Sequence, residues 1–382
     1  MAKLKIAIAC QGGGSQTAFT AGALKTLCEA HVGQDFEIAG ISGTSGGALC
    51  ATLMWYSHMK GERPLWKRMM EFWKENTAQG PVEHAINQFI VDSMRMVNSG
   101  MWPAFQISPS SAIMKSMMEM MTVGQRKGFS DFRGLIESYI DFDEIASWGP
   151  QPGPPVLMLG AANVNSGALA KFISRKEPIR IEHVLASCAV PTLFPAVQIG
   201  KDAYWDGLFS DNPPVEELIR PRSMGVSNIP SEIWLIKINP TASRRVPVQM
   251  GEIIDRRNQI EGNISLFHQL SHLEMLNDMI LHDAFRPEFL AHFDIKRAVR
   301  IPKSFETDGK RPYHIPCIEM PPELQDMMDL EGKMDRGSQN INRLIAEGEK
   351  AAKVFLEARA AAVAASPLEI GNIADFSWEE RG

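Results

Sequence analysis

The stretch FEIAGISGTSGGALCATLMWY, residues 36–56, reads as a strand, a glycine-rich turn and a helix in succession. Its first six residues are mostly apolar, which is typical of a short buried strand, and residues 46–56 form an apolar run that predicts a helix. A similar unit precedes it, with an apolar strand over 3–10 and a helix over 17–30. Two such units predict an α/β sheet with helices on its faces, where sites form beyond the carboxyl ends of the strands.

The remainder of the chain continues this alternation and then becomes mainly helical. The region 57–150 is helical in pattern and rich in methionine, which indicates an insertion into the sheet. The last ~15 residues are expected to be loose. Further strands are expected at 156–161, 169–173 and 233–238, a short helix at 181–189, helical stretches at 251–293 and 341–358, and a proline-bounded connector with a possible edge strand at 302–316.

Composition excludes several classes of protein. The 382 residues are 45% hydrophobic and 22% charged, as in ordinary globular proteins, and the net charge of −6 argues against a nucleic-acid partner. The five cysteines are odd in number, widely spaced and without a CxxC pair, which argues against a disulfide framework and a zinc cluster. No run of apolar residues is long enough for a signal peptide or a membrane-spanning helix. We therefore expect a cytoplasmic protein.

The turn within the opening stretch is Gly43-Thr44-Ser45-Gly46-Gly47. It fits the G-x-S-x-G nucleophile elbow, in which the glycines allow a tight turn and the serine projects from the strand end at a helix N-terminus. Glycine–serine turns are also common as purely structural turns, so the pentapeptide alone fits both interpretations. The preceding strand and the following helix favour Ser45 as a candidate nucleophile, with Gly43 and Gly47 as the elbow glycines.

A second glycine-rich turn, Gln11-Gly12-Gly13-Gly14-Ser15, follows the first strand. Consecutive glycines let backbone N–H groups point into one concavity that suits an anion. Two phosphate-binding motifs do not match, because G-x-G-x-x-G requires glycine where Thr17 stands, and the Gly-Lys-Ser/Thr of a P-loop is absent. The remaining interpretations are an oxyanion hole formed by Gly12, Gly13 and Gly14, or a plain tight turn.

A serine nucleophile needs a base, and no histidine is a convincing one. His183 lies within a predicted helix, and the others that we considered lie on helical stretches or in connectors: His268, His272, His282, His292 and His314. Asp206 is the better candidate, because it ends a strand in Tyr204-Trp205-Asp206-Gly207. By itself, however, an aspartate before glycine is most often a turn residue.

Taken together, these segments resemble the patatin-like phospholipase family, whose members use a Ser–Asp dyad. Four blocks match in order. They are the loop Gly12–Gly14 with its helix, the elbow Gly43–Gly47, the block from Ala186-Ser187-Cys188-Ala189-Val190-Pro191 to Pro195, and Trp205-Asp206-Gly207 followed by Asp211-Asn212-Pro213-Pro214-Val215.

The resemblance implies the chemistry of the site. Asp206 would accept the proton of Ser45 as the serine attacks an ester carbonyl, and the N–H groups of the Gly12–Gly14 loop would hold the oxyanion of an intermediate on the way to an acyl-enzyme. The neighbours Tyr204, Trp205, Leu208 and Phe209 are expected to surround Asp206 with apolar groups. The chain departs from the family pattern at Gln16 and Thr17, where a basic residue and glycine are usual, and at Leu208, where a small residue is usual.

The resemblance also implies a three-layer patatin-like α/β sheet with helices on both faces. Residues 1–240 would form the catalytic domain, with the helical Met-rich insertion at about 57–150, and residues 241–382 a mainly helical region packed on it. The expected substrate is a phospholipid or a related ester. No cofactor is expected, and the residues show no metal-ligand spacing, so no calcium requirement is expected.

Two further expectations concern partners and alternatives. Peripheral membrane contact is suggested by the Met-rich insertion, although an ordinary helical core is the simpler explanation for most of its methionines. It is also suggested by six basic residues, for which a solvated face is the simpler explanation: Lys296, Arg297, Arg300, Lys303, Lys310 and Arg311. The oligomeric state is not indicated. The alternative functions are a carboxylesterase, thioesterase or storage-polyester depolymerase with the same dyad, or a catalytically degenerate lipid-binding relative.

Overall fold

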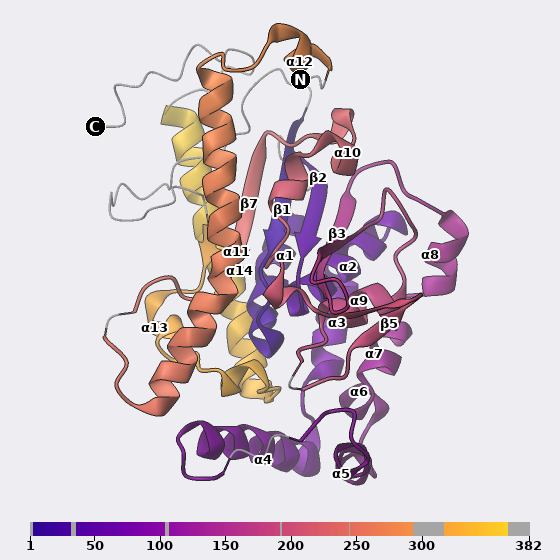
Figure 1. The fold of residues 1–382 in the computed structure, drawn as a ribbon, viewed down its shortest axis with the longest axis vertical. Coiled ribbons are helices and arrows are strands. Elements are labelled where there is room, and N and C mark those ends of the chain that lie inside the picture. The colour runs from indigo at the N-terminus through magenta and orange to yellow at the C-terminus, as the bar shows by residue number, and fades with distance from the viewer. Residues whose placement is uncertain are drawn as a thin grey trace.

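The computed structural model of the chain describes residues 3–31, 36–103, 107–191, 193–243, 245–292 and 317–365. Within these residues the chain forms an eight-stranded mixed sheet in the order β5–β6–β3–β2–β1–β7–β8, with β4 also paired to β3 (Figure 1). The strands are β1 (Leu4–Cys10), β2 (Phe36–Gly43), β3 (Val156–Asn163), β4 (Leu169–Ile173), β5 (Val197–Ile199), β6 (Asp202–Asp206), β7 (Glu232–Lys237) and β8 (Cys317–Glu319).

Helices cover both faces of this sheet and form the insertion. The α-helices are α1 (Ala18–His31), α2 (Gly46–Met59), α3 (Lys67–Asn76), α4 (Gly80–Asn98), α5 (Ala112–Thr122), α6 (Lys127–Ser130), α7 (Phe132–Tyr139), α8 (Phe142–Trp148), α9 (Ile181–Ser187), α10 (Pro221–Met224), α11 (Met250–Leu281), α12 (Pro287–His292), α13 (Pro322–Gln325) and α14 (Ser338–Ala365). Short 3₁₀ turns are η1 (Gly14–Thr17), η2 (Gly207–Phe209), η3 (Glu216–Ile219), η4 (Val226–Asn228) and η5 (Glu331–Lys333).

The central strand β1 shows why the molecule has three layers. Its side chains alternate between two cores, because successive residues of a strand point to opposite faces. Ile6 and Ile8 pack in the larger core together with residues of α1, α2 and α14. Ala7 and Ala9 pack in the smaller core, to which α11 contributes Leu266, Leu270 and Leu273. A continuous apolar run is therefore required in β1, since both of its faces are buried.

The helix α14 packs closely on α1 through two glycines. A Cβ atom at Gly22 would lie 2.0 Å from the backbone oxygen of Ile345, and one at Gly348 would lie 2.0 Å from the backbone oxygen of Phe19. Both helices therefore need glycine where they cross. At the same face, Phe355 of α14 packs edge-on against Trp234 of β7, with 5.2 Å between ring centroids.

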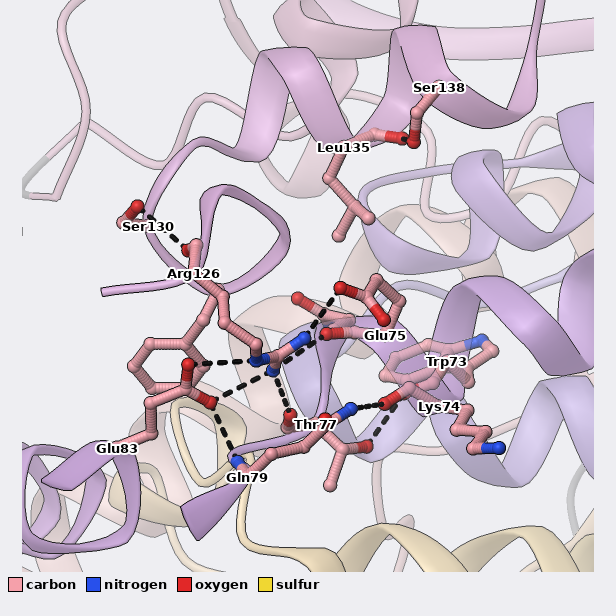
Figure 2. Close-up of polar contacts among 12 residues, drawn as sticks. Trp73, Lys74, Glu75, Thr77, Gln79, Glu83, Arg126, Ser130, Leu135 and Ser138 are labelled. Atoms are coloured by element: carbon pink, nitrogen blue, oxygen red, sulfur yellow. Dashed lines mark hydrogen bonds and ion pairs between the residues drawn. The ribbon is translucent and has the colours of Figure 1, made fainter. Parts of the chain in front are cut away.

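The insertion is held together by a part-buried charge network around Arg126, at the start of α6 (Figure 2). Its Nε and Nη2 donate to the two carboxylate oxygens of Glu83 at 2.9 Å, and its Nη1 donates to Glu75 at 2.5 Å. Glu83 also accepts from the backbone N–H of Gln79 at 2.7 Å. Burial opposes ionisation of Glu83, but the hydrogen bonds from Arg126 and Gln79 outweigh it and lower the pKa of Glu83. The network therefore joins α3, α4 and α6.

The predicted α/β fold is confirmed, including the strands at 3–10, 36–41, 156–161, 169–173 and 233–238. The helix predicted over 251–293 is instead two helices, because α11 ends at Leu281 and α12 begins at Pro287. The hairpin of β5 and β6 was not predicted. The connector at 302–316, the six basic residues at 296–311 and the last ~15 residues lie outside the described residues. None of the described helices combines the length and the apolar character that spanning a bilayer demands.

Candidate active site

Pairing along β3 brings the candidate dyad together. One edge of β3 pairs with β2 as far as Leu159 opposite Gly43, and the same edge then pairs with β6 from Ala161 opposite Asp206. The opposite edge of β3 pairs with β4. Because β6 follows β2 along a single edge of β3, Asp206 lies just beyond the end of β2, where the chain turns at Ser45.

Ser45 occupies a strained turn at the N-terminus of α2. Its φ of 56° and ψ of −132° place a non-glycine residue at positive φ, a conformation that costs free energy and is found at functional sites. The backbone N–H of Ser45 donates to Ser187 Oγ at 3.0 Å, and the Ser187 hydroxyl donates to the carbonyl of Gly160 at 2.7 Å. The side chain of Ser45 is 9% exposed. This geometry is that of the strand–turn–helix elbow predicted from the sequence.

The elbow glycines are needed for close packing. A Cβ atom at Gly43 would lie 2.5 Å from the backbone oxygen of Gly47, and one at Gly47 would lie 2.3 Å from the backbone oxygen of Cys10. A Cβ atom at Gly46 would lie 2.1 Å from Thr17 Oγ1. A side chain at Gly43 would push α2 away from β2, one at Gly47 would push it away from β1, and one at Gly46 would push it away from η1.

The loop Gly12–Gly14 lies directly against Ser45. A Cβ atom at Gly12 would be 2.7 Å from the Cβ of Ser45, so the two turns touch. The N–H of Gly12 donates to Asn212 Oδ1 at 2.7 Å and is therefore engaged within the protein. Gly14 has a φ of +56°, which favours glycine, and it begins η1 directly after Gly13. Amides at the start of a helical turn have no acceptor within that turn, so the N–H groups of Gly13 and Gly14 suit an anion.

Asp206 is fully buried at the end of β6. Its Oδ1 accepts from the N–H of Leu208 at 2.8 Å, whereas its Oδ2 has no hydrogen-bond partner of good geometry among the described residues. Burial raises the pKa of Asp206 to about 7, against the lowering effects of the Leu208 amide, the Ser45 side chain and the charge of Lys333. The hydroxyl of Ser45 is thus close enough to interact with a carboxyl group whose ionisation falls near neutral pH.

The apolar surroundings expected for Asp206 are only partly present. Tyr204, Trp205 and Leu208 are half-buried, but Phe209 is 57% exposed. The expectation for Phe209 was wrong, because the turn η2 carries it past the end of the strand. On the buried side, the thiol of Cys188 neighbours Asp206, and burial raises the pKa of that thiol well above its usual value.

The structure agrees that His183 is a packing residue. It is fully buried and stacks on Phe172, with 4.1 Å between ring centroids. Burial lowers the pKa of His183 to about 3, so its imidazole is neutral near pH 7.

Sequence reasoning missed several polar residues around the site. Gln11 links β7 to α11, since its Oε1 accepts from the N–H of Asn239 at 2.9 Å and its Nε2 donates to Asn263 at 2.8 Å. Asn212 fixes Gly12, as described above. Lys333 lies near the dyad, and burial lowers its pKa to about 8. The block containing Asn212 was among the matched motifs, but no local pattern distinguishes Lys333.

The fold and this site define an α/β protein with a strained serine elbow, a glycine loop and a buried carboxyl group at one end of the sheet. The family model described as patatin-like phospholipase matches residues 8–219, more than half of the chain. The chain therefore belongs to the patatin-like phospholipase family, a family of lipid acyl hydrolases.

Comparison with solved structures finds similarity to VipD from Legionella pneumophila. The two chains share 12% sequence identity with a TM-score of 0.36, and the alignment covers 93% of this chain and 67% of that chain. No curated protein matches the sequence significantly.

Proposed function

We propose that this protein is a serine lipid acyl hydrolase that cleaves carboxylic ester bonds through a Ser45–Asp206 dyad. The observation that carries the proposal is the convergence of a strained Ser45 and a fully buried Asp206, whose pKa is raised to about 7, at the same end of the sheet. A free aspartate, with a pKa of about 3.9, is a poor base for a serine hydroxyl, and burial reduces that mismatch by raising the pKa.

In the proposed reaction, Asp206 accepts the proton of Ser45 Oγ as that oxygen attacks the ester carbonyl. The N–H groups of Gly13 and Gly14 hold the negative oxygen of the tetrahedral intermediate, each contributing on the order of 3 kcal/mol. The intermediate collapses, the alcohol leaves with the proton from Asp206, and an acyl-enzyme forms on Ser45. Water then gives a proton to Asp206 and attacks the acyl group, and Asp206 passes that proton to Ser45 Oγ as the fatty acid is released. Gly12 supports the loop rather than the oxyanion, because its N–H is bound to Asn212.

Exposed apolar side chains on the insertion support a lipid substrate and peripheral membrane contact. Figure 1 shows α4 and α5 at the end of the molecule opposite α12. The exposed residues on and between these helices are Val82, Phe89, Met101, Trp102, Ile113, Met117, Met120 and Val123. Such a concentration of exposed apolar groups is typical of a surface that meets a membrane or an apolar partner. The same helix α4 contacts η5 beside the site, through Asn98 and Glu331.

The test is covalent labelling by a fluorophosphonate, which forms a bond to an activated serine. We expect the native protein to be labelled, Ser45→Ala to be unlabelled and Asp206→Asn to be labelled much more slowly. An unlabelled native protein, or a Ser45→Ala variant that is still labelled, would contradict the proposal. Comparing the hydrolysis of phospholipid vesicles and of a short p-nitrophenyl ester then separates a lipid acyl hydrolase from a carboxylesterase.

A further inference from the structure

A segment that lies outside the family match packs on the glycine loop. We call residues 329–336, which connect α13 to α14, the strap. A Cβ atom at Gly14 would lie 2.3 Å from the backbone oxygen of Lys333, and Gln16 Nε2 donates to the backbone oxygen of Asp329 at 3.0 Å. The strap and the loop after β1 are therefore in direct contact, although about 315 residues separate them in the chain.

The strap is also fixed from two other sides. Asp255 of α11 accepts from the backbone N–H of Leu330 at 2.8 Å. Asn98 of α4 donates to the carboxylate of Glu331 at 2.6 Å. Contacts with α4, α11 and the glycine loop thus determine where the side chain of Lys333 lies.

The ammonium group of Lys333 bridges the strap to the active site. Its Nζ donates to Asn239 Oδ1 at 3.2 Å and also to Asn258 Oδ1. Asn239 in turn donates from Nδ2 to the backbone oxygen of Gly12 at 3.5 Å, a long hydrogen bond. The charge of Lys333 also acts on Asp206, since each of the two groups favours the charged form of the other.

We propose that Lys333 is a positioning residue of this active site, whose hydrogen bond to Asn239 steadies the Gly12–Gly14 loop and whose positive charge favours the carboxylate form of Asp206. This inference rests on the proposed roles of Ser45 and Asp206. Lys333 lies outside residues 8–219, the region that the family model matches. The proposal therefore adds to the site a residue that the family match does not include.

The other titratable groups near this pair also matter for the test. Asp255 faces Lys333, and burial raises the pKa of Asp255 to about 6, with smaller contributions from Glu331 and Asp329. The thiol of Cys188 beside Asp206 stays neutral, because burial raises its pKa. Asp255 is therefore the group whose titration could be confused with that of Asp206.

The experiment measures the ionisation of Asp206 directly by pH-difference infrared spectroscopy of the full chain. The carboxyl band of Asp206 is assigned by its loss in Asp206→Asn, and the Asp255 band by its loss in Asp255→Asn. We define the Asp206 midpoint as the pH at which half of the Asp206 carboxyl groups are ionised. In Lys333→Met we expect this midpoint to rise by about one pH unit, because a nearby opposite charge is removed. In Lys333→Arg the charge remains, so the midpoint is expected to return toward the native value.

Two matched variants separate charge from structure. Asn258→Ala removes a hydrogen bond of Lys333 but keeps its charge, so the Asp206 midpoint should stay within a few tenths of a unit. Lys350→Met removes an exposed lysine of α14 and should leave the midpoint unchanged. If Lys333→Met leaves the Asp206 midpoint unchanged, or if Asn258→Ala shifts it as far as Lys333→Met, the proposal is overturned.

The rate of fluorophosphonate labelling supplies the functional readout. At pH 7, Lys333→Met should be labelled roughly fivefold more slowly than the native protein, because a rise of one pH unit in the pKa of a base that is half ionised at pH 7 lowers its ionised fraction about fivefold. The acid limb of its pH profile should shift upward. Labelling at the native rate would contradict the proposal. The infrared midpoint does not depend on Ser45 being a nucleophile, so an unlabelled native protein with a shifted midpoint in Lys333→Met overturns the hydrolase function and leaves the charge coupling standing.

Discussion

The hydroxyl of Ser187 is the support on which the elbow depends, and its removal makes a quantitative prediction. In Ser187→Ala, two buried backbone groups lose their partner, namely the N–H of Ser45 and the carbonyl of Gly160. Each buried polar group left unpaired costs about 1–3 kcal/mol, so the free energy of unfolding should fall by about 2–6 kcal/mol. The hydrogen bond to Ser187 also helps to hold Ser45 at its strained φ. The rate of labelling should therefore fall by a larger factor than the fraction of folded protein does.

The assay combines urea denaturation, followed by tryptophan fluorescence, with the rate of fluorophosphonate labelling under folding conditions. The matched control is Ser147→Ala, because Ser147 is exposed and its hydroxyl donates only to the carbonyl of Glu144 within α8. That variant should lie within about 0.5 kcal/mol of the native protein. The reasoning is refuted if Ser187→Ala has the same midpoint of urea denaturation as the native protein and is labelled at the same rate.

Three other predictions concern pH, the insertion and the helix crossing. The labelling rate should rise with pH and reach half of its maximum near pH 7, because Asp206 acts only when ionised; a midpoint near pH 4 would contradict this. Arg126→Met should lower the free energy of unfolding by about 2–4 kcal/mol, since it leaves the buried Glu83 carboxylate without its cationic partner, and the native protein should lose stability as acid protonates Glu83, whose pKa is lowered in the folded state; an unchanged denaturation curve for the variant would contradict it. Gly348→Ala should lower the melting temperature by several degrees, whereas Gly251→Ala, whose added Cβ would meet nothing nearer than 4.0 Å, should not; equal effects would refute the close helix contact.

Local patterns were sufficient to predict most of the fold. The apolar strands 3–10 and 36–41 and their glycine turns are visible in the sequence because a buried parallel strand must be apolar on both faces. Ser45 was also identifiable from a local pattern, because the elbow needs glycine at particular spacings around the serine. The helix break after Leu281 was missed, although Pro287 within the run is a local signal for it, since proline is disfavoured inside a helix and is tolerated in its first turn.

The assembly of the site was harder to predict from the sequence. Asp206 approaches Ser45 because β6 pairs with β3 beyond the end of β2, a contact between residues far apart in the chain. Without the family resemblance, Asp206 would have been interpreted as an ordinary turn residue. Lys333 lies in a polar connector without periodicity, and only its packing against Gly14 and Asn239 shows that it belongs to the site.

The central claim is that Asp206 is the base that activates Ser45. The most direct test compares the second-order rate constants of fluorophosphonate labelling for the native protein and Asp206→Asn at pH 8, with the labelled residue identified by tandem mass spectrometry. We predict an adduct on Ser45 in both proteins and a rate lower by at least ~100-fold in the variant, as is typical when a general base is removed. An adduct on another residue, or equal rates for the two proteins, would contradict the account.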